Sequence, residues 1–229
     1  MLSRTAFFEP LAATLRGASR EATILHGGSG SNAAIIASAS QQAHRAAGDE
    51  RVIVVPHSGA GPLLPSVLAG FPAGQAAAIF LDATLPHPGR PRLDELREAL
   101  PADAYQQLER GLQGGESWPD WTDEQLAPLI PDDETRRAVL AMVTPRTLGF
   151  FEEPLPPDDL PAELPCAYLR LSAAYDQPLA TAESRDWPVR SLDLTHLAPY
   201  THARDVAREL IALSGEVLPE QTDVRRSRR

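Results

Sequence analysis

Two patterns of apolar and polar positions alternate along this chain. Short runs that are continuously or alternately apolar, typical of strands in a buried sheet, occupy residues 22–25, 52–55, 76–81, 165–171 and 189–194. Between them, apolar residues recur at helical spacing in residues 7–17, 33–47, 62–68 and 203–213. Strands that alternate with helices form β-α-β units, so the sequence predicts a mostly parallel sheet flanked by helices.

Residues 87–164 interrupt this alternation. Charged patches with helical spacing follow one another there, separated by prolines, in residues 93–100, 104–112, 123–129 and 134–143. An insertion between two sheet strands predicts a helical lid, which excludes water and shapes a pocket. The predicted division of the chain is a first part of the core, a lid, a second part of the core and a disordered tail, in residues 1–86, 87–164, 165–214 and 215–229.

Composition limits the possible chemistry. The 229 residues are 43% hydrophobic, which suits one large α/β domain. The formal net charge is −10, which makes nucleic acid or an anionic membrane an unsuitable partner. The sequence contains no lysine, which excludes Schiff-base chemistry and a P-loop lysine.

The single cysteine, Cys166, lies in a predicted strand and is expected to be a core thiol. One cysteine cannot form an internal disulfide or a structural zinc site, and we expect neither a metal nor a cofactor. No secretory leader pattern and no apolar run of membrane-spanning length is present. We therefore expect a cytoplasmic protein without a membrane partner.

A serine lies where the second predicted strand ends. The run of residues 52–55 leads into Pro56, His57 and Ser58, and small residues follow. Small neighbours permit a sharp, strained turn from strand to helix that would expose the Ser58 hydroxyl and place the Gly59 N–H near a developing oxyanion. The simpler alternative is a strand-to-helix turn that Ser58 merely caps.

A serine nucleophile needs a base and a third group that orients the base. His196 follows the last predicted strand and is the predicted base. Asp82 ends the strand of residues 76–81, and an aspartate after an apolar strand requires a compensating partner, so it is the favoured acid. Asp176, in a polar loop after the next strand, is the alternative acid.

Three aromatic side chains are candidates for substrate binding. His57 adjoins the serine, and we expect it to pack beneath the lid. Trp118 and Trp121 lie within residues 87–164 and either fill the core of the lid or line an acyl pocket. Residues 27–31 are rich in glycine but match no phosphate-binding motif, so they are expected to form a flexible connection.

The segments 55–65, 80–86, 150–154 and 165–171 together carry a family resemblance. They resemble small bacterial α/β-hydrolase-fold proteins and are similar in architecture to the Dieckmann cyclases of natural-product biosynthesis. In those cyclases the acid follows the strand after the nucleophile, which would assign that role to Asp82. The cyclases use cysteine where this chain has Ser58, which favours hydrolysis or acyl transfer to oxygen.

The N-terminus departs from the same family. The resemblance implies further strands and an oxyanion loop before the first helix, but only residues 1–6 precede it. Either the first strands are missing, or residues 2–5 form an abbreviated oxyanion loop. An exposed sheet edge would favour a homodimer.

Three functions are compatible with these features. The first is a serine hydrolase that cleaves an ester or thioester through an acyl-enzyme. The second is a Dieckmann-type cyclase or an acyltransferase acting on a carrier-bound acyl chain. The third is a catalytically silent hydrolase-like binding protein.

Overall fold

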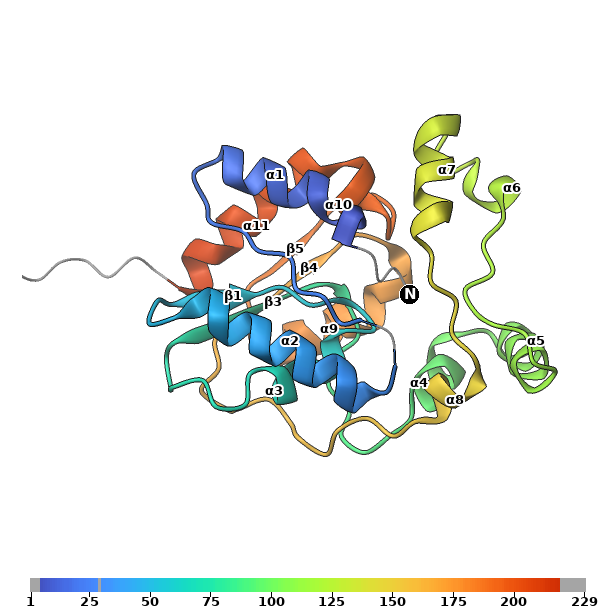
Figure 1. The fold of residues 1–229 in the computed structure, drawn as a ribbon, viewed down its shortest axis with the longest axis horizontal. Coiled ribbons are helices and arrows are strands. Elements are labelled where there is room, and N and C mark those ends of the chain that lie inside the picture. Colours follow the sequence, from blue (N-terminus) through green and yellow to red (C-terminus); the bar gives the residue numbers. More distant parts are fainter. Residues whose placement is uncertain (1–4, 29, 219–229) are drawn as a thin grey trace, which may run out of the picture.

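A computed structural model describes residues 5–28 and 30–218, and its centre is a parallel sheet (Figure 1). Within the described residues the sheet has five strands, all paired in parallel, in the order β1-β3-β4-β5, with β2 also paired to β3. Their bounds are Val52–Val54 (β1), His57–Ser58 (β2), Ala76–Ala83 (β3), Cys166–Arg170 (β4) and Val189–Ser191 (β5). The predicted parallel sheet is confirmed.

Pro56 lies between β1, which falls within the predicted strand of residues 52–55, and β2, which follows it. Val54 lies opposite Ala78 and His57 opposite Leu81, so the register along β3 is the same on both sides of the proline. Proline has no N–H to donate to the ladder, but its carbonyl still accepts a hydrogen bond from Leu81 N at 2.9 Å. The register therefore holds as far as His57, and it shifts at Ser58, which lies opposite Ala83.

Strand β3 is the centre of the core. All eight of its residues are buried, and alternate side chains belong to two different hydrophobic clusters. Ala77, Ile79 and Leu81 pack with α1 (Glu9–Gly17) and α11 (Ala203–Val217), whereas Ala78 and Phe80 pack with α3 (Leu64–Val67) and α9 (Asp176–Ser184). This alternation follows from the two-residue period of a strand with helices on both faces.

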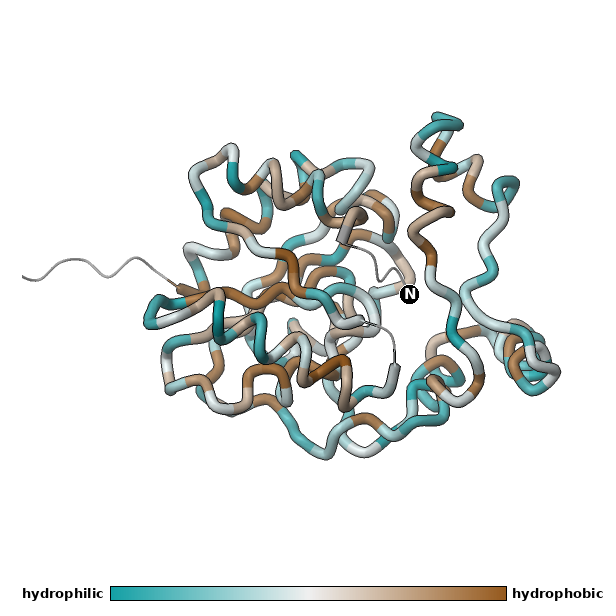
Figure 2. The backbone as a smooth tube through the Cα atoms, viewed as in Figure 1, coloured by the Kyte–Doolittle hydropathy of each residue, from teal (hydrophilic) through white to brown (hydrophobic). Residues whose placement is uncertain are grey.

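Two helical layers cover the sheet (Figure 1). One face carries α1 (Glu9–Gly17), α10 (Ala198–Thr201) and α11 (Ala203–Val217), and the other carries α2 (Asn32–Ala47), α3 (Leu64–Val67) and α9 (Asp176–Ser184). The strands are strongly hydrophobic, and hydrophobic stretches also occur in the helices and in the segment between β3 and β4 (Figure 2). Cys166 is buried among them as a free thiol, and burial raises its pKa to about 12.

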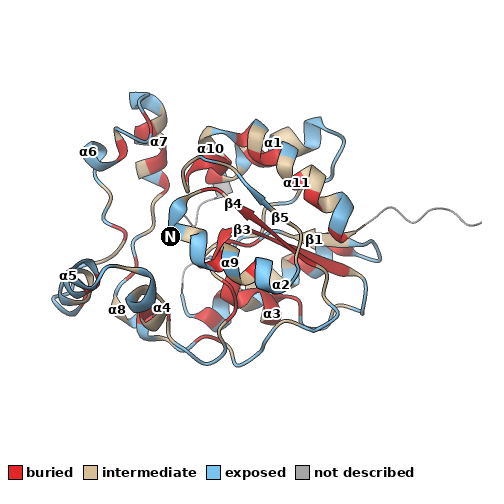
Figure 3. Cartoon of the chain, turned by 180° about the vertical axis from the view of Figure 1, so that it is seen from behind, coloured by how far each residue is buried: buried red, intermediate tan, exposed pale blue. Residues whose placement is uncertain are grey.

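Residues 87–164 form a separate helical group beside the sheet (Figures 1 and 3). It joins β3 to β4, which are direct neighbours in the sheet, so the segment is an insertion between adjacent strands. Its helices are α4 (Arg92–Ala99), α5 (Ala102–Gln113), α6 (Asp123–Leu126), α7 (Asp133–Met142) and α8 (Leu148–Glu152). The first four match predicted helices, whereas α8 was not predicted.

The predicted strand at residues 22–25 is wrong. This segment has no strand structure, and helix side chains bind the backbone at Ala22 and at His26, just beyond the segment. Arg16 Nε donates to Ala22 O at 2.9 Å, and Gln42 both donates to His26 O and accepts from His26 N. Among the described residues no strand precedes β1, which agrees with the predicted reduction of the N-terminal strands.

Two further expectations concern the ends of the chain. Helix α11 continues to Val217, so residues 215–217 of the predicted tail are helical. Residues 219–229 of that tail lie outside the described residues, as do residues 2–4 of the abbreviated oxyanion loop. Thr5 begins a short 3-10 helix, Thr5–Phe7. No helix in the described ranges is long and apolar enough to cross a membrane.

Candidate active site

Ser58 ends β2 on a turn with unusual backbone geometry. Its φ angle is 58°, in the left-handed region that residues other than glycine rarely occupy. A short 3-10 helix, Gly61–Leu63, begins just beyond the turn. A Cβ at Gly61 would lie 1.8 Å from the carbonyl oxygen of Thr84, so only glycine permits this close approach.

Asp82, near the end of β3, is fully buried and fully hydrogen-bonded. Its Oδ1 accepts from Leu171 N at 2.7 Å and Ser172 N at 3.0 Å. Its Oδ2 accepts from Ser172 Oγ at 2.8 Å and lies 2.8 Å from His196 Nδ1. These four contacts offset the desolvation of the carboxylate and hold it in one orientation. The φ angle of Asp82 is 41°, a second left-handed position at the same edge of the sheet.

His196 lies between β5 and α10 with its imidazole between two aromatic rings. The His57 ring is stacked on it with centroids 4.3 Å apart, and the Tyr175 ring with centroids 5.0 Å apart. The contact with Asp82 uses Nδ1, so Nε2 is the nitrogen that remains for proton transfer. The acid and the stacked rings therefore fix the orientation of the imidazole.

The Ser58 hydroxyl bonds to Tyr175, not to His196. The two hydroxyl oxygens are 3.2 Å apart, and either group can be the donor. Burial raises the pKa of the Tyr175 phenol, so it stays protonated at neutral pH. Tyr175 therefore contacts both the serine and the histidine in this structure.

Asp176 lies apart from this arrangement. Its carboxylate is exposed and forms an ion pair with Arg170 Nε at 2.7 Å. The sequence predicts a loop at this position, but Asp176 is the first residue of α9. The aspartate that contacts His196 is Asp82, and Asp176 makes no contact with the imidazole.

His57 is buried beside the serine. Its Nε2 lies 3.2 Å from the carbonyl oxygen of His196, and its ring contacts Phe7 and Phe8. Burial and the neighbouring His196 lower the pKa of His57 well below 6.5. His57 is therefore neutral at physiological pH and donates its Nε2 proton to that carbonyl.

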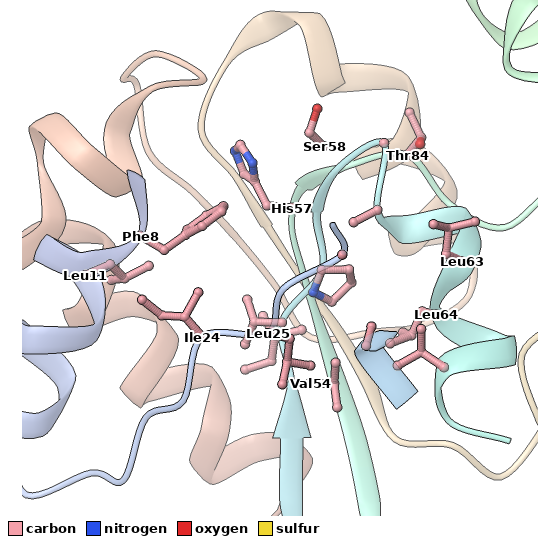
Figure 4. A pocket seen from close by; sticks show the side chains of 18 of the residues that line it. Phe8, Leu11, Ile24, Leu25, Val54, His57, Ser58, Leu63, Leu64 and Thr84 are labelled. Atoms are coloured by element: carbon pink, nitrogen blue, oxygen red, sulfur yellow. The ribbon is translucent and has the colours of Figure 1, made fainter. Parts of the chain in front are cut away.

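A cavity of about 1090 Å³ joins these residues. Ser58, Gly59, His57 and His196 line it together with Trp118 and Trp121 of the inserted segment. Both tryptophans are half-buried and also pack against hydrophobic clusters of that segment, so the two sequence interpretations of them are compatible. Apolar side chains form part of the cavity lining (Figure 4), namely Phe8, Leu11, Ile24, Leu25, Val54, Leu63 and Leu64.

Several residues of this cavity were not predicted from the sequence. One is Tyr175, which precedes the alternative acid but belongs to no motif. Another is Thr84, which lies near Ser58 (Figure 4) and whose buried hydroxyl has no hydrogen-bond partner. Gly27 and Gly28 also line the cavity, although they were expected to form a plain connection. A signal was available for them, because a glycine-rich loop between residues 22–25 and a helix lets backbone N–H groups approach a ligand. Within residues 5–28 and 30–218, no histidine, cysteine, aspartate and glutamate side chains are grouped to hold a metal ion.

Comparison with known proteins provides evidence on the fold. Neither the protein-family models nor the curated proteins searched contain a match to the sequence. Solved structures do match. An extracellular α/β-hydrolase from a Paenibacillus species has a TM-score of 0.70 at 16% identity, over 94% of each chain. The fold is that of the α/β-hydrolases.

Two plant proteins with the α/β-hydrolase fold match over similar lengths. Tomato methylketone synthase I, solved with 2-tridecanone, has a TM-score of 0.64 at 13% identity over 93% of each chain. A methylesterase from Arabidopsis has a TM-score of 0.57 at 19% identity over 92% of this chain and 94% of its own. At such identities the likeness concerns the fold and leaves the reaction of this chain open.

Proposed function

We propose that this protein is a serine hydrolase that cleaves an ester or thioester through an acyl-enzyme. The observation that carries the proposal is the 2.8 Å contact between Asp82 and His196, beside a serine on a left-handed turn that lines the same cavity. A base oriented by a buried carboxylate and a nucleophile on a strained turn form the arrangement that acyl transfer requires. Several structural neighbours are described as esterases or a methylesterase, which is compatible with this chemistry.

In the proposed reaction, Ser58 Oγ attacks the acyl carbon while its proton passes to His196 Nε2. The bond to the alcohol or thiol then breaks, and His196 returns the proton to that leaving group. Water, deprotonated by His196, attacks the acyl-enzyme, releases the acid and restores Ser58. Asp82 holds the Nδ1–H of His196 and stabilises the imidazolium that forms at each step.

The oxyanion is proposed to bind backbone N–H groups. Gly59 follows the nucleophile and lines the cavity, and we assign the first donor to its N–H. Gly27 and Gly28 line the same cavity, and we assign the second donor to their loop. A single oxyanion donor is worth about 10²–10³ in rate, so both positions matter.

Formation of the acyl-enzyme first requires a change at Ser58. Its hydroxyl is bonded to Tyr175 and must turn toward His196 before the proton can move. Catalytic hydrogen bonds often form only when substrate is bound. We assign to Tyr175 the role of holding the resting serine and supporting the imidazole.

Labelling with a fluorophosphonate, followed by mass mapping, tests the proposal. We expect modification of Ser58 in the wild type and none in His196→Ala. Product analysis with an acyl-carrier thioester then separates hydrolysis, which gives a free acid, from cyclisation, which gives a ring. A folded protein that is not labelled would contradict both enzymatic functions and favour the silent binding protein.

The two aspartates provide a matched comparison. Asp82→Asn is expected to reduce ester turnover by about 10³–10⁴-fold, because the amide no longer orients the correct imidazole tautomer. Asp176→Asn breaks only a surface ion pair, so turnover should stay within about twofold. Circular dichroism verifies the fold of both variants. A large loss of turnover in Asp176→Asn with none in Asp82→Asn would reverse the assignment.

The cytoplasmic location and the homodimer stay predictions.

A further inference from the structure

Two arginines of the inserted segment are buried in the cavity wall. Arg92, at the start of α4, is 4% exposed, and Arg146, between α7 and α8, is 8% exposed. Both line the cavity that contains Ser58. A guanidinium is always charged and is rarely buried without a partner of opposite charge. Two of them at one cavity therefore require an explanation.

Their protein partners are neutral. Arg92 Nη1 donates to Asn32 Oδ1 at 2.6 Å, and Arg146 Nη2 donates to Gly28 O at 3.4 Å. The Nε and Nη2 groups of Arg92 and the Nε of Arg146 are buried without an acceptor. In the part of the chain that the structure describes, neither guanidinium forms an ion pair with a carboxylate.

The nearby acids interact with other donors. Glu95, one turn beyond Arg92 and also in the cavity wall, has its carboxylate 3.0 Å from His87 Nε2. Both carboxylate oxygens of Glu153 accept from Asn32 N at 2.9 Å. These acids contribute to the field at Arg92 without bonding to it, and burial lowers the pKa of Arg92 to about 10.

The two guanidinium groups share one aromatic ring. Arg92 lies 4.4 Å and Arg146 4.9 Å from the centroid of Phe150. The ring stabilises each cation through its face but cannot accept hydrogen bonds from the N–H edges. On Arg92 the unbonded atoms, Nε and Nη2, form the planar two-donor edge that matches two oxygens of an acidic group.

We propose that Arg92 and Arg146 bind an anionic oxygen group of the substrate, a carboxylate or a phosphate, within the cavity that contains Ser58. Asn32 positions Arg92 for this contact through the bond to Nη1. The substrate would thus be an ester or thioester that also carries an acidic group. This inference rests on the proposed hydrolase function for its kinetic test but not for its binding test.

Two esters of equal chain length provide the kinetic test. 4-Nitrophenyl hydrogen glutarate carries a carboxylate, and 4-nitrophenyl pentanoate is its neutral counterpart. We expect the wild type to favour the acidic ester by at least about tenfold in kcat/KM, since hydrogen bonds between charged groups are the strong ones. Arg92→Gln and Arg146→Gln should each raise KM for the acidic ester by about 10–100-fold, with kcat and the neutral ester little changed.

Three controls keep the kinetic result interpretable. Arg137→Gln removes an exposed arginine of α7 and should keep the preference. Arg92→Lys keeps the charge and should retain part of the affinity but lose the two-donor edge. Unchanged fluorophosphonate labelling of Ser58 shows that a variant is folded. Equal kcat/KM for both esters in the wild type, or a preference that survives in both glutamine variants, would overturn the proposal.

Calorimetry tests binding to the two arginines without requiring catalytic turnover. Glutarate and inorganic phosphate are titrated separately into the wild type and the two glutamine variants. Binding that is lost in the variants supports the site, and the ligand that binds more tightly identifies the acidic group. Failure of both ligands to bind the wild type would contradict it. If glutarate or phosphate binds through the arginines but Ser58 is not labelled, the hydrolase proposal alone is rejected. If Ser58 is labelled but neither ligand binds and the acidic ester is not preferred, the anion site alone is rejected.

Discussion

At the scale of single residues, His196 depends on its neighbours for its orientation. Asp82 contacts Nδ1 from the side, and the rings of His57 and Tyr175 cover the two faces. Each neighbour comes from a different part of the chain. The imidazole therefore keeps its position only while β2, β3 and the segment before α9 are correctly packed.

Tyr175 variants separate its hydroxyl from its ring. Tyr175→Phe keeps the stacking and frees Ser58 from a bond worth about 1 kcal/mol, so fluorophosphonate labelling should be about fivefold faster. Tyr175→Ala also removes the ring that supports His196 and should slow labelling at least about tenfold. A loss greater than tenfold in Tyr175→Phe would show that the phenol itself takes part in the reaction.

His57 links stability to pH. Its pKa is lowered in the folded state, so below about pH 6.5 the unfolded chain binds a proton that the folded chain does not. The free energy of unfolding should therefore decrease as the pH falls below 6.5, by up to about 1.4 kcal/mol per pH unit from this residue. Urea denaturation at pH 7.5, 6.5 and 5.5 measures this, and His57→Phe should show a shallower dependence. Equal slopes in the two proteins would disprove the contribution.

At the scale of elements, the turn after β2 is held by its contact with the end of β3. Thr84 N donates to Ser58 O at 3.3 Å, and the Thr84 carbonyl leaves no room for a side chain at position 61. Strand β2 ends in a residue with a positive φ, Ser58, and the second-last residue of β3, Asp82, also has a positive φ. Strain of this kind persists only where the surrounding packing imposes it, and it is concentrated at functional sites.

Substitution of glycine tests this packing. Gly61→Ala should lower the free energy of unfolding by at least about 2 kcal/mol, because backbone must move to admit the methyl group. Gly215→Ala is the matched control: a Cβ there meets nothing within 4 Å, and alanine should stabilise α11 by roughly 0.5–1 kcal/mol. Thermal and urea unfolding measure both changes. A Gly61→Ala protein as stable as the wild type would contradict the close approach.

At the scale of the whole molecule, burial differs between the sheet and the insertion (Figure 3). Strand β3 is buried along its length and paired on both sides. Helix α5 buries only Tyr105 and Leu112. The insertion contributes one wall of the cavity, so its local stability bears on access to Ser58.

Hydrogen exchange followed by mass spectrometry should resolve this difference. Amides of Ala76–Ala83 are expected to exchange only on global unfolding, whereas those of Ala102–Gln113 should exchange through local opening at much lower protection. The physical reason is the smaller buried area that α5 would expose when it opens. Equal protection in the two segments would show that the insertion and the sheet unfold as one unit.

The pattern of residues predicted most elements of this fold because it is local. Apolar runs identified the strands, and Ser58 followed by small residues identified the turn. The pattern failed at residues 22–25, where an apolar run has no strand partner and its ends bind helix side chains. It also missed the short helix α8, whose five residues are too few to show a helical period.

The sequence by itself determined the parallel sheet, the position of the insertion and the two aspartates that could orient a histidine. Only the tertiary structure shows that Asp82, and not Asp176, contacts His196, because this contact joins residues 114 positions apart. The same holds for Tyr175 and for the buried pair Arg92 and Arg146, whose surroundings come from segments distant in the chain. Local propensity selects helices and strands, whereas burial, hydrogen bonding and charge depend on which segments the fold brings together.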